Sequence, residues 1–221
     1  MAYRRTENTV RRLAARHDAI IVAARAAAAE GGMAAIQIAP VAERAGIAAG
    51  TVYRYFPSKT DLVAALVAAI SEREIAAVRH AAQAAPGPLS ALAAAIATFA
   101  TRALRNRRLA WAVIAEPVDA DVDALRLGYR KAFAAELETQ ISAAIAGGHL
   151  PEQDAKLAAP ALAGALLEGL IGPLAQPTED AVKARAAVQM LTLLALRALG
   201  VVDARARGLV VQIALPDEDA A

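Results

Sequence analysis

Glycine and proline divide the sequence into segments of helical length, and the residue that fills these segments most often is alanine. More than a quarter of the 221 residues are alanine, the strongest helix former, whereas aromatic residues make up only 4%. The main breaks lie at Gly31-Gly32, Gly46, Pro57, Pro86-Gly87-Pro88, Pro117, Gly147-Gly148, Gly172-Pro173, Pro177 and Gly200. We therefore expect an all-α fold, with 57% hydrophobic residues to build its core.

About nine helices are expected between these breaks. Apolar residues at helical spacing predict the first helix at about residues 9–30. The other eight are expected near 38–45, 49–56, 58–83, 89–106, 108–116, 121–146, 154–171 and 179–199. Pro160 predicts a kink or a later start of its helix. Residues 208–215 could be a short strand or a packed extension, and residues 216–221 a loose tail, so the segment 201–221 is left open.

Composition excludes several classes of protein. The sequence has no cysteine, which excludes disulfides, thiolate zinc sites and a cysteine nucleophile, and is consistent with a reducing compartment. The start of the chain is polar and basic, and no stretch of about 18 residues is free of charge and proline. We therefore expect neither a signal peptide nor a membrane span, and a cytoplasmic protein.

The positive charge is concentrated in the first part of the chain. Residues 1–60 hold 9 Lys and Arg against 4 Asp and Glu, a net charge of +5, whereas residues 61–221 hold 15 against 18, a net charge of −3. This asymmetry indicates a polyanionic partner at one end of the molecule.

Two short helices separated by a glycine turn are expected in this basic part. The segments 38–45 and 49–56 flank Gly46, which suits the unusual backbone angles of a tight turn. The pattern is typical of a helix-turn-helix motif. Ser58 and Asp61 form a capping-box pattern that predicts the start of the long helix that follows.

The stretch VAERAGIAAGTVYRYFPSK, residues 41–59, resembles the DNA-binding signature of the TetR (tetracycline-repressor) family of bacterial regulators. The resemblance extends over residues 17–66. It implies an amino-terminal three-helix helix-turn-helix DNA-binding domain, residues 1–65. It also implies a larger helical domain for effector binding and dimerisation, residues 66–221, and a homodimer that uses the last two main helices.

The second helix of the motif supplies the candidates for reading DNA bases. Amino-terminal side chains of such a helix meet base edges, which selects Ala49, Gly50, Thr51 and Arg54. Arg54 alone has long polar reach, and it could bond a guanine or grip a phosphate.

The resemblance implies phosphate contacts by further side chains, namely Gln37, Tyr53, Tyr55 and Lys59. Packing on the first helix is the alternative for the tyrosines, and a solvated charge is the alternative for Lys59. The family often has threonine at Gln37 and a small hydroxyl residue at Ala48, so this chain departs from the pattern there.

A basic run precedes or begins the first helix and comprises Arg4, Arg5, Arg11, Arg12 and Arg16. It could follow a phosphate backbone or enter a minor groove, or it could be a solubilising arm. His17 could contact a phosphate or simply lie on the surface.

Residues of the larger domain are weaker candidates for an effector site. They are its aromatic residues and three charged ones, Phe99, Trp111, Glu116, Arg126, Tyr129, Phe133 and Glu168. Core packing explains the aromatic residues equally well. Glu168 interrupts an apolar run, where a buried carboxylate would need a partner, and it could face the effector pocket, the dimer seam or solvent. Small and apolar residues on the last two helices would let helices pack closely, either between two protomers of a dimer or within the core of a monomer. They are Ala161, Gly164, Ala165, Ala186, Met190 and Leu193.

These features favour a ligand-responsive transcriptional regulator, a homodimeric repressor released from a palindromic double-stranded DNA operator by a small-molecule effector. Two alternatives stay open: a helical dimeric adaptor and an all-helical enzyme, each without specific DNA binding. The three histidines lie in separate segments, and the sequence shows no metalloprotease, phosphate-loop or nucleophile-elbow motif. We therefore expect no enzyme, no cofactor, no metal site and no membrane partner.

Overall fold

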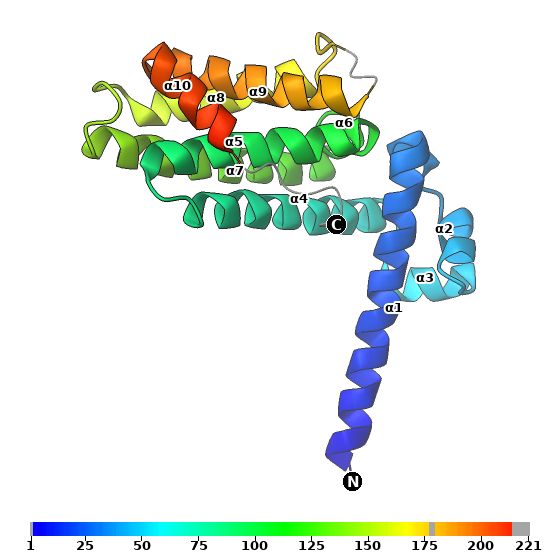
Figure 1. Ribbon diagram of the computed structural model, residues 1–221. Coiled ribbons are helices and arrows are strands. Elements are labelled where there is room, and N and C mark those ends of the chain that lie inside the picture. The colour runs from blue at the N-terminus through cyan, green and yellow to red at the C-terminus, as the bar shows by residue number, and fades with distance from the viewer. Residues whose placement is uncertain (1, 177–179, 214–221) are drawn as a thin grey trace. The chain divides into compact units, whose positions relative to one another are not determined.

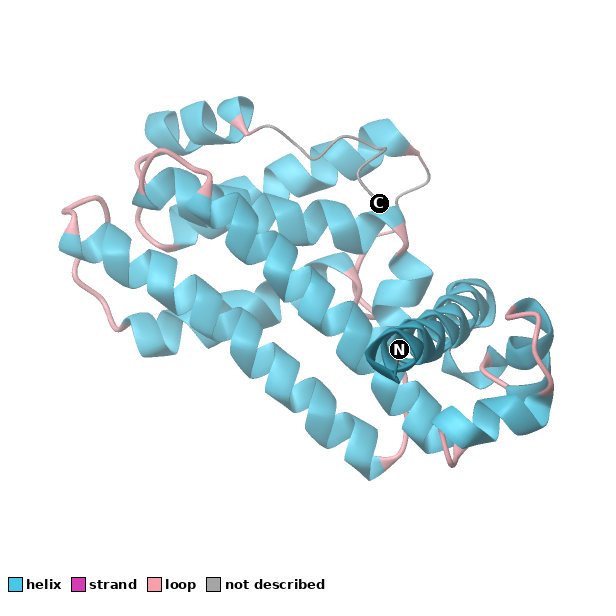
Figure 2. Ribbon diagram, turned by 90° about the horizontal axis from the view of Figure 1, so that it is seen from below, coloured by secondary structure: helices cyan, strands magenta, loops and turns pink. Residues whose placement is uncertain are grey.

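The computed structural model describes residues 2–176 and 180–213, with side chains from Asn8 onward. In this part the chain forms ten α-helices and one short 3₁₀-helix, with loops between them and no strand (Figure 2). The elements are α1 (Ala2–Gly31), η1 (Met33–Ala35), α2 (Ile38–Arg44), α3 (Ala49–Tyr55), α4 (Lys59–Gln83), α5 (Pro88–Arg105), α6 (Arg107–Ile114), α7 (Ala120–Ala146), α8 (Ala155–Leu170), α9 (Ala181–Ala198) and α10 (Asp203–Gln212). The all-α prediction is confirmed, and the described part has one α-helix more than expected.

The chain forms two compact units, each considered separately below. Unit 1 contains residues 1–71 and 108–126, and unit 2 contains residues 72–107 and 127–221. The functional division into residues 1–65 and 66–221 stays a prediction, because a compact unit is defined by packing and a functional domain by what it binds.

Unit 1 is built around the carboxyl-terminal half of α1. Helix α1 packs against η1 and α2, and α2 packs against α3 (Figure 1). Side chains with no exposed surface fill the space between these helices: Ile20, Ala24, Ala28, Ile36, Val41, Val52, Leu62 and Leu66. Helices α2 and α3 have only seven residues each, shorter than an isolated helix needs for stability, so their formation depends on this packing.

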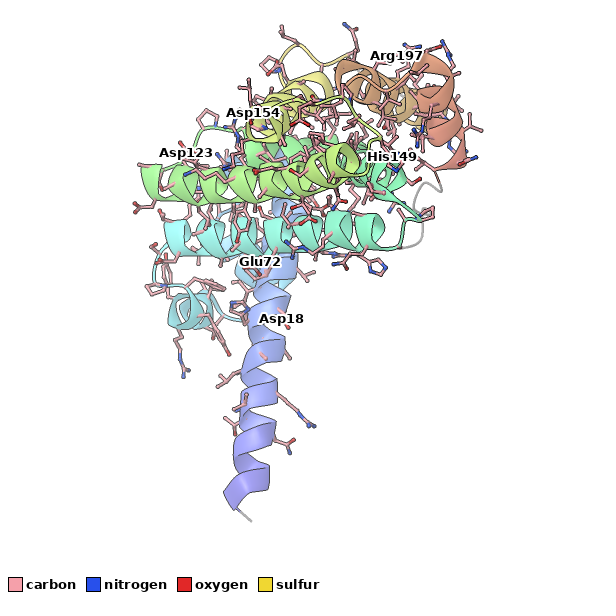
Figure 3. The ribbon with its side chains drawn as sticks, turned by 90° about the vertical axis from the view of Figure 1, so that its left-hand side faces the viewer. Asp18, Glu72, Asp123, His149, Asp154 and Arg197 are labelled. Carbon is pink, nitrogen blue, oxygen red and sulfur yellow. The ribbon has the colours of Figure 1, made fainter. Side chains whose placement is uncertain are left out.

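Unit 2 is a bundle of longer helices. Helix α5 packs against α8, α9 and α10, and α9 also contacts α8 and α10 (Figure 1). The helix α5 buries a nearly continuous face, including Leu92, Ile96 and Ala100, each with no exposed surface. Polar links join the ends of the bundle helices: Asp154 caps α8 through the amide of Lys156, and Arg197 pairs with Asp203 of α10 (Figure 3).

At the ends of the chain, one expectation was wrong and one open choice is decided. Helix α1 begins at Ala2 rather than near Thr9, so the basic run lies within a helix. Residues 208–212 are helical, the end of α10, and not a strand, because Ala206 and Val210 are buried one turn apart on one helical face. Residues 214–221, with the expected tail, lie outside the described residues.

Helices α8 and α9 also differ in detail from expectation. Helix α8 starts at Ala155 and includes Pro160, so the proline does not delay its start. Residues 177–179, where the last of these helices was expected to begin, lie outside the described residues. Asp180 caps α9 by accepting the amide of Lys183 at 2.7 Å. Within residues 2–176 and 180–213, every helix is too short or too polar to cross a membrane.

Candidate nucleic-acid interface

Helices α2 and α3 meet at a tight turn centred on Gly46. The backbone of Gly46 has φ +65°, a left-handed conformation that glycine adopts without steric cost. The amide of Ile47 donates to the carbonyl oxygen of Ala42 at 3.0 Å, which ties the turn back to α2. The predicted helix-turn-helix is therefore present, and Gly46 has the predicted role.

Helix α3 presents one face to solvent and buries the other. Val52 is completely buried in unit 1, whereas Gly50, Tyr53 and Arg54 are exposed. The predicted readout residues Ala49 and Thr51, and the predicted phosphate contact Tyr55, are partly buried. Tyr53 has 52% of its surface exposed, which leaves it accessible to a partner. Arg54 extends the reach of this face with a flexible cationic side chain.

The amino ends of α2 and α3 lack the usual side-chain caps. Gln37 is the N-cap of α2, but its Nε2 donates to the carbonyl oxygen of Ala34 at 3.0 Å instead of capping the helix. Ala48 is the N-cap of α3 and has no side-chain oxygen to accept a hydrogen bond. The first turn of α3 therefore has no side-chain cap, and the amide of Thr51 donates to the carbonyl oxygen of Ala48 at 2.8 Å.

Helix α4 begins with the predicted capping box. The Oγ of Ser58 accepts the amide of Asp61 at 3.0 Å, and the Oδ2 of Asp61 accepts the amide of Ser58 at 2.9 Å. Lys59 follows directly as the first residue of α4 and is exposed. The predicted phosphate contact therefore lies at a helix amino terminus, where the helix dipole already favours an anion.

Helix α1 contacts the motif at two places. The ring of His17 packs on Phe56, the residue that ends α3, with ring centroids 5.1 Å apart. Both guanidinium amino groups of Arg44 on α2 donate to the carboxylate of Glu30 near the end of α1. These hydrogen bonds lower the pKa of Glu30 and raise that of Arg44. His17 therefore makes an aromatic contact, in addition to its place at the surface.

Residues far along the chain complete unit 1, and no motif in the sequence predicts this. Oε2 of Glu116 accepts the amide of Met33 at 3.1 Å, and Oδ2 of Asp119 accepts the hydroxyl of Thr60 at 2.7 Å. A Cβ atom on Gly32 would lie only 2.4 Å from Oε2 of Glu116. Gly32 has φ +76°, as its position at the end of α1 suggested, and it allows the carboxylate to approach the backbone.

Arg126, a candidate effector contact, is a buried structural residue of unit 1. Only 5% of its surface is exposed, and its amino groups donate to the carbonyl oxygens of Glu116 and Ala112, each at 2.5 Å. Burial lowers its pKa, while Asp123 acts in the opposite direction through a hydrogen bond of 3.2 Å. The guanidinium therefore holds the carboxyl end of α6 to the start of α7. Trp111 lies partly buried on α6.

The candidate effector residues of unit 2 fall into separate places. The rings of Phe99 on α5 and Phe133 on α7 stack with centroids 4.3 Å apart. The hydroxyl of Tyr129 lies 3.4 Å from Oε1 of Glu72, and burial together with this carboxylate raises the tyrosine pKa. Glu168 is exposed rather than buried, and its Oε1 accepts the amide of Leu174 at 3.3 Å. The ligand roles stay predictions.

Helices α8 and α9 each expose an apolar stripe. On α8 the exposed residues include Leu157, Ala161, Gly164 and Ala165, and on α9 they include Val182, Ala186, Met190 and Leu194. Leu157 and Val182 have 70% and 79% of their surface exposed. Residues four apart lie on one side of a helix, so each set forms a continuous stripe. Leu193, expected in this seam, is partly buried, and its neighbour Leu194 is the exposed leucine.

Comparison with known proteins agrees with this geometry. Residues 20–66 match the model of the TetR family of bacterial regulatory proteins. The chain is 38% identical over 109 residues to the HTH-type transcriptional repressor KstR of Mycolicibacterium smegmatis, which covers 49% of this chain and 53% of that protein. It is 48% identical over 58 residues to KstR of Rhodococcus jostii, covering 26% of this chain and 27% of that one. The chain thus spans about a quarter to a half of the length of these two relatives.

Solved structures share the fold over most of the chain. The fatty acid degradation regulator FadR from Bacillus halodurans superposes with a TM-score of 0.73 at 22% identity, covering 85% of this chain and 97% of that one. RolR in complex with resorcinol gives a TM-score of 0.65 at 21% identity, covering 94% and 98%. FadR from Bacillus subtilis in complex with stearoyl-CoA gives 0.67 at 21% identity, covering 79% and 96%.

Fold and site together define an all-α protein that carries a helix-turn-helix motif with an exposed second helix. The glycine turn and the capping box both lie within residues 20–66, the segment that matches the family model. Residues 20–66 carry the amino-terminal signature of the TetR family of bacterial regulatory proteins, and the chain resembles repressors with this signature over part of its length.

Proposed function

We propose that the protein is a homodimeric transcriptional repressor that binds a palindromic DNA operator and is released from it by a small-molecule effector. The observation that carries the proposal is the exposed face of α3, with Gly50, Tyr53 and Arg54 turned to solvent behind a glycine turn. The curated relatives that match this segment are transcriptional repressors by name. Such a regulator acts in the cytoplasm on double-stranded DNA and performs no catalysis.

Specific DNA binding is the first part of the proposal to test. Fluorescence anisotropy would follow titration of the purified protein into its own upstream intergenic DNA and into a scrambled duplex, at low and at near-physiological salt. We expect tight binding to the intergenic DNA that persists at the higher salt. Equal and weak binding to both duplexes, lost as salt increases, would show only the charge of the basic segment and would favour the adaptor or the enzyme.

Dimerisation is the second part, and it follows from the apolar stripes of α8 and α9. Exposed apolar side chains in this number are unusual for a monomer, and a two-fold axis would pack the stripes of one protomer against those of its partner. Sedimentation velocity of the variant Met190→Arg with Leu194→Arg should show monomers, whereas the wild type should be dimeric. The control Val211→Arg changes a residue on α10 that is more exposed than Met190 and Leu194, and it should leave the dimer intact.

Effector release is the third part. An effector can release DNA only if it binds better to a conformation whose recognition helices do not fit the two half-sites, so operator DNA must in turn weaken effector binding. The stacked rings of Phe99 and Phe133 offer an apolar wall for such a ligand in unit 2. Resorcinol and stearoyl-CoA, bound by two structural neighbours, are suitable first probes. A compound that releases the operator from the wild type should act more weakly on Phe133→Ala.

A further inference from the structure

The amino-terminal half of α1 is a helix without a core. Every residue from Asn8 to Arg16 is exposed, and the first fully buried side chain of α1 is Ile20. Helix formation over this stretch therefore leaves its side chains open to solvent on all sides within unit 1. We call residues 2–16 the basic arm.

The arm carries an excess of positive charge. Residues 2–16 contain five arginines and one acidic residue, Glu7, a net charge of +4. From Asn8 to Arg16, where the side chains are described, three arginines occur and no acidic residue. Arg12 and Arg16 lie one turn apart, about 6 Å along the helix, and only about 40° apart around it. Two phosphates of one DNA strand lie within that span, because each strand carries a charge about every 3.4 Å along the axis.

The arm starts beside the recognition helix. His17 packs on Phe56, the residue that follows α3, so the arm leaves unit 1 near the carboxyl end of that helix. From this point α1 continues well beyond α3 (Figure 1). Fifteen helical residues extend about 22 Å, more than the roughly 12 Å width of a major groove. The arm is therefore long enough to reach backbone outside the groove that α3 occupies.

We propose that the basic arm binds the phosphate backbone of DNA that flanks the base pairs read by α3, and so enlarges the site that each protomer covers. This inference rests on the proposed function, because it requires a bound operator. Phosphate contacts carry no sequence information, so the arm would add affinity and fix the position of the protein without changing which bases are preferred.

The test uses the full chain with Arg12→Gln and Arg16→Gln together. An operator duplex is first selected from a random library with the wild-type protein. Anisotropy titrations over a series of salt concentrations then give the slope of log K against log salt. We expect the double variant to lower this slope by about 1 to 2 and to weaken binding about tenfold on every sequence. Base preference within the selected site should not change.

Three controls make the result specific to the arm. Arg130→Gln with Lys131→Gln removes the same charge from the exposed surface of α7 and should keep the wild-type slope. Arg12→Lys with Arg16→Lys keeps the charge and should keep most of the slope. Shortening the DNA on either side of the operator should weaken DNA binding by the wild type. It should not weaken DNA binding by the glutamine variant any further, because the shorter duplex and the substitutions remove the same contacts.

Each contrary result has a distinct meaning. If the wild type binds its selected operator and the glutamine variant shows the same slope and the same loss on shortened duplexes, the arm does not contact DNA. Unchanged DNA binding with lost binding to vesicles of anionic lipid would assign the arm to a membrane surface and overturn the inference. If library selection yields no preferred sequence for the wild type, the proposed function fails as well.

Discussion

Units 1 and 2 are stabilised in different ways. Unit 1 contains two helices of only seven residues, and polar contacts at single positions, such as Glu116 with Met33 and Glu30 with Arg44, add to its apolar core. Unit 2 consists of longer helices with apolar faces, and packing of alanine and leucine dominates its interior. Unit 1 must hold α3 in one orientation, so its structure depends on contacts between particular atoms. The structure of the bundle in unit 2 depends mainly on how well apolar side chains fill its interior.

The largest effect is expected from a core truncation in unit 2. Leu196 on α9 has no exposed surface, so Leu196→Ala removes buried methyl groups and leaves a cavity. We expect the free energy of unfolding to fall by about 3 to 4 kcal/mol, measured by urea denaturation. Leu127→Ala, at a leucine with half its surface exposed, should change it by less than about 0.5 kcal/mol. Equal effects at both positions would contradict the packing described for this bundle.

A glycine of unit 1 should be nearly as sensitive as this leucine. Gly32→Ala forces an alanine to adopt φ +76° and ψ −168°, and its Cβ would collide with the carboxylate of Glu116. We expect a loss of about 2 to 3 kcal/mol, mostly from backbone strain. Gly50→Ala is the matched control, since no atom lies within 4 Å of the added Cβ, and it should stabilise α3 slightly. A tolerated Gly32→Ala would show that the clamp by Glu116 is not needed.

A smaller effect is expected from a hydroxyl on the exposed face of α3. Tyr53→Phe removes one hydrogen-bonding group from a half-exposed side chain and leaves the ring in place. We expect binding to all DNA sequences to weaken by about 1 kcal/mol, with unchanged base preference and unchanged stability, in anisotropy titrations. Altered base preference would instead place Tyr53 at a base edge.

The smallest effect is expected at the ion pair between α1 and α2. Arg44 lowers the pKa of Glu30 in the folded protein, so the carboxylate stabilises the fold above its ordinary pKa of 4.5. That contribution disappears as pH falls through the lowered pKa, when Glu30 becomes protonated. Glu30→Gln should therefore be slightly less stable than the wild type at pH 7, and the two should converge in acid. A difference that persists at pH 2 would contradict the assignment to this charge.

The sequence predicts the helix-turn-helix well because its signals are local. Gly46, Ser58 and Asp61 each specify backbone geometry within a few residues, and the structure confirms all three. Contacts between distant residues leave no such signal. Glu116 was a candidate for effector binding, and only the folded chain shows its carboxylate at the amide of Met33.

The same limit explains why the sequence left residues 208–215 undecided between a strand and a packed extension. The apolar residues around Val210 and Val211 are β-branched, which favours a strand when the segment is considered alone. In the fold, α10 packs on α5 and α9, and burial of one helical face decides the outcome. The sequence also left the direction of Glu168 open among the effector pocket, the dimer seam and solvent, and the structure shows it exposed on α8.

The most direct test of the account is a base-by-base preference profile of Arg54→Ala. Every base pair of the selected operator is changed in turn, and the affinity of the wild type and of the variant is measured for each duplex at near-physiological salt. The account predicts that Arg54→Ala loses about 1 to 3 kcal/mol of discrimination at one position in each half-site and keeps the rest of the profile. A profile that is unchanged, or weakened equally at all positions, would contradict base reading by this face of α3.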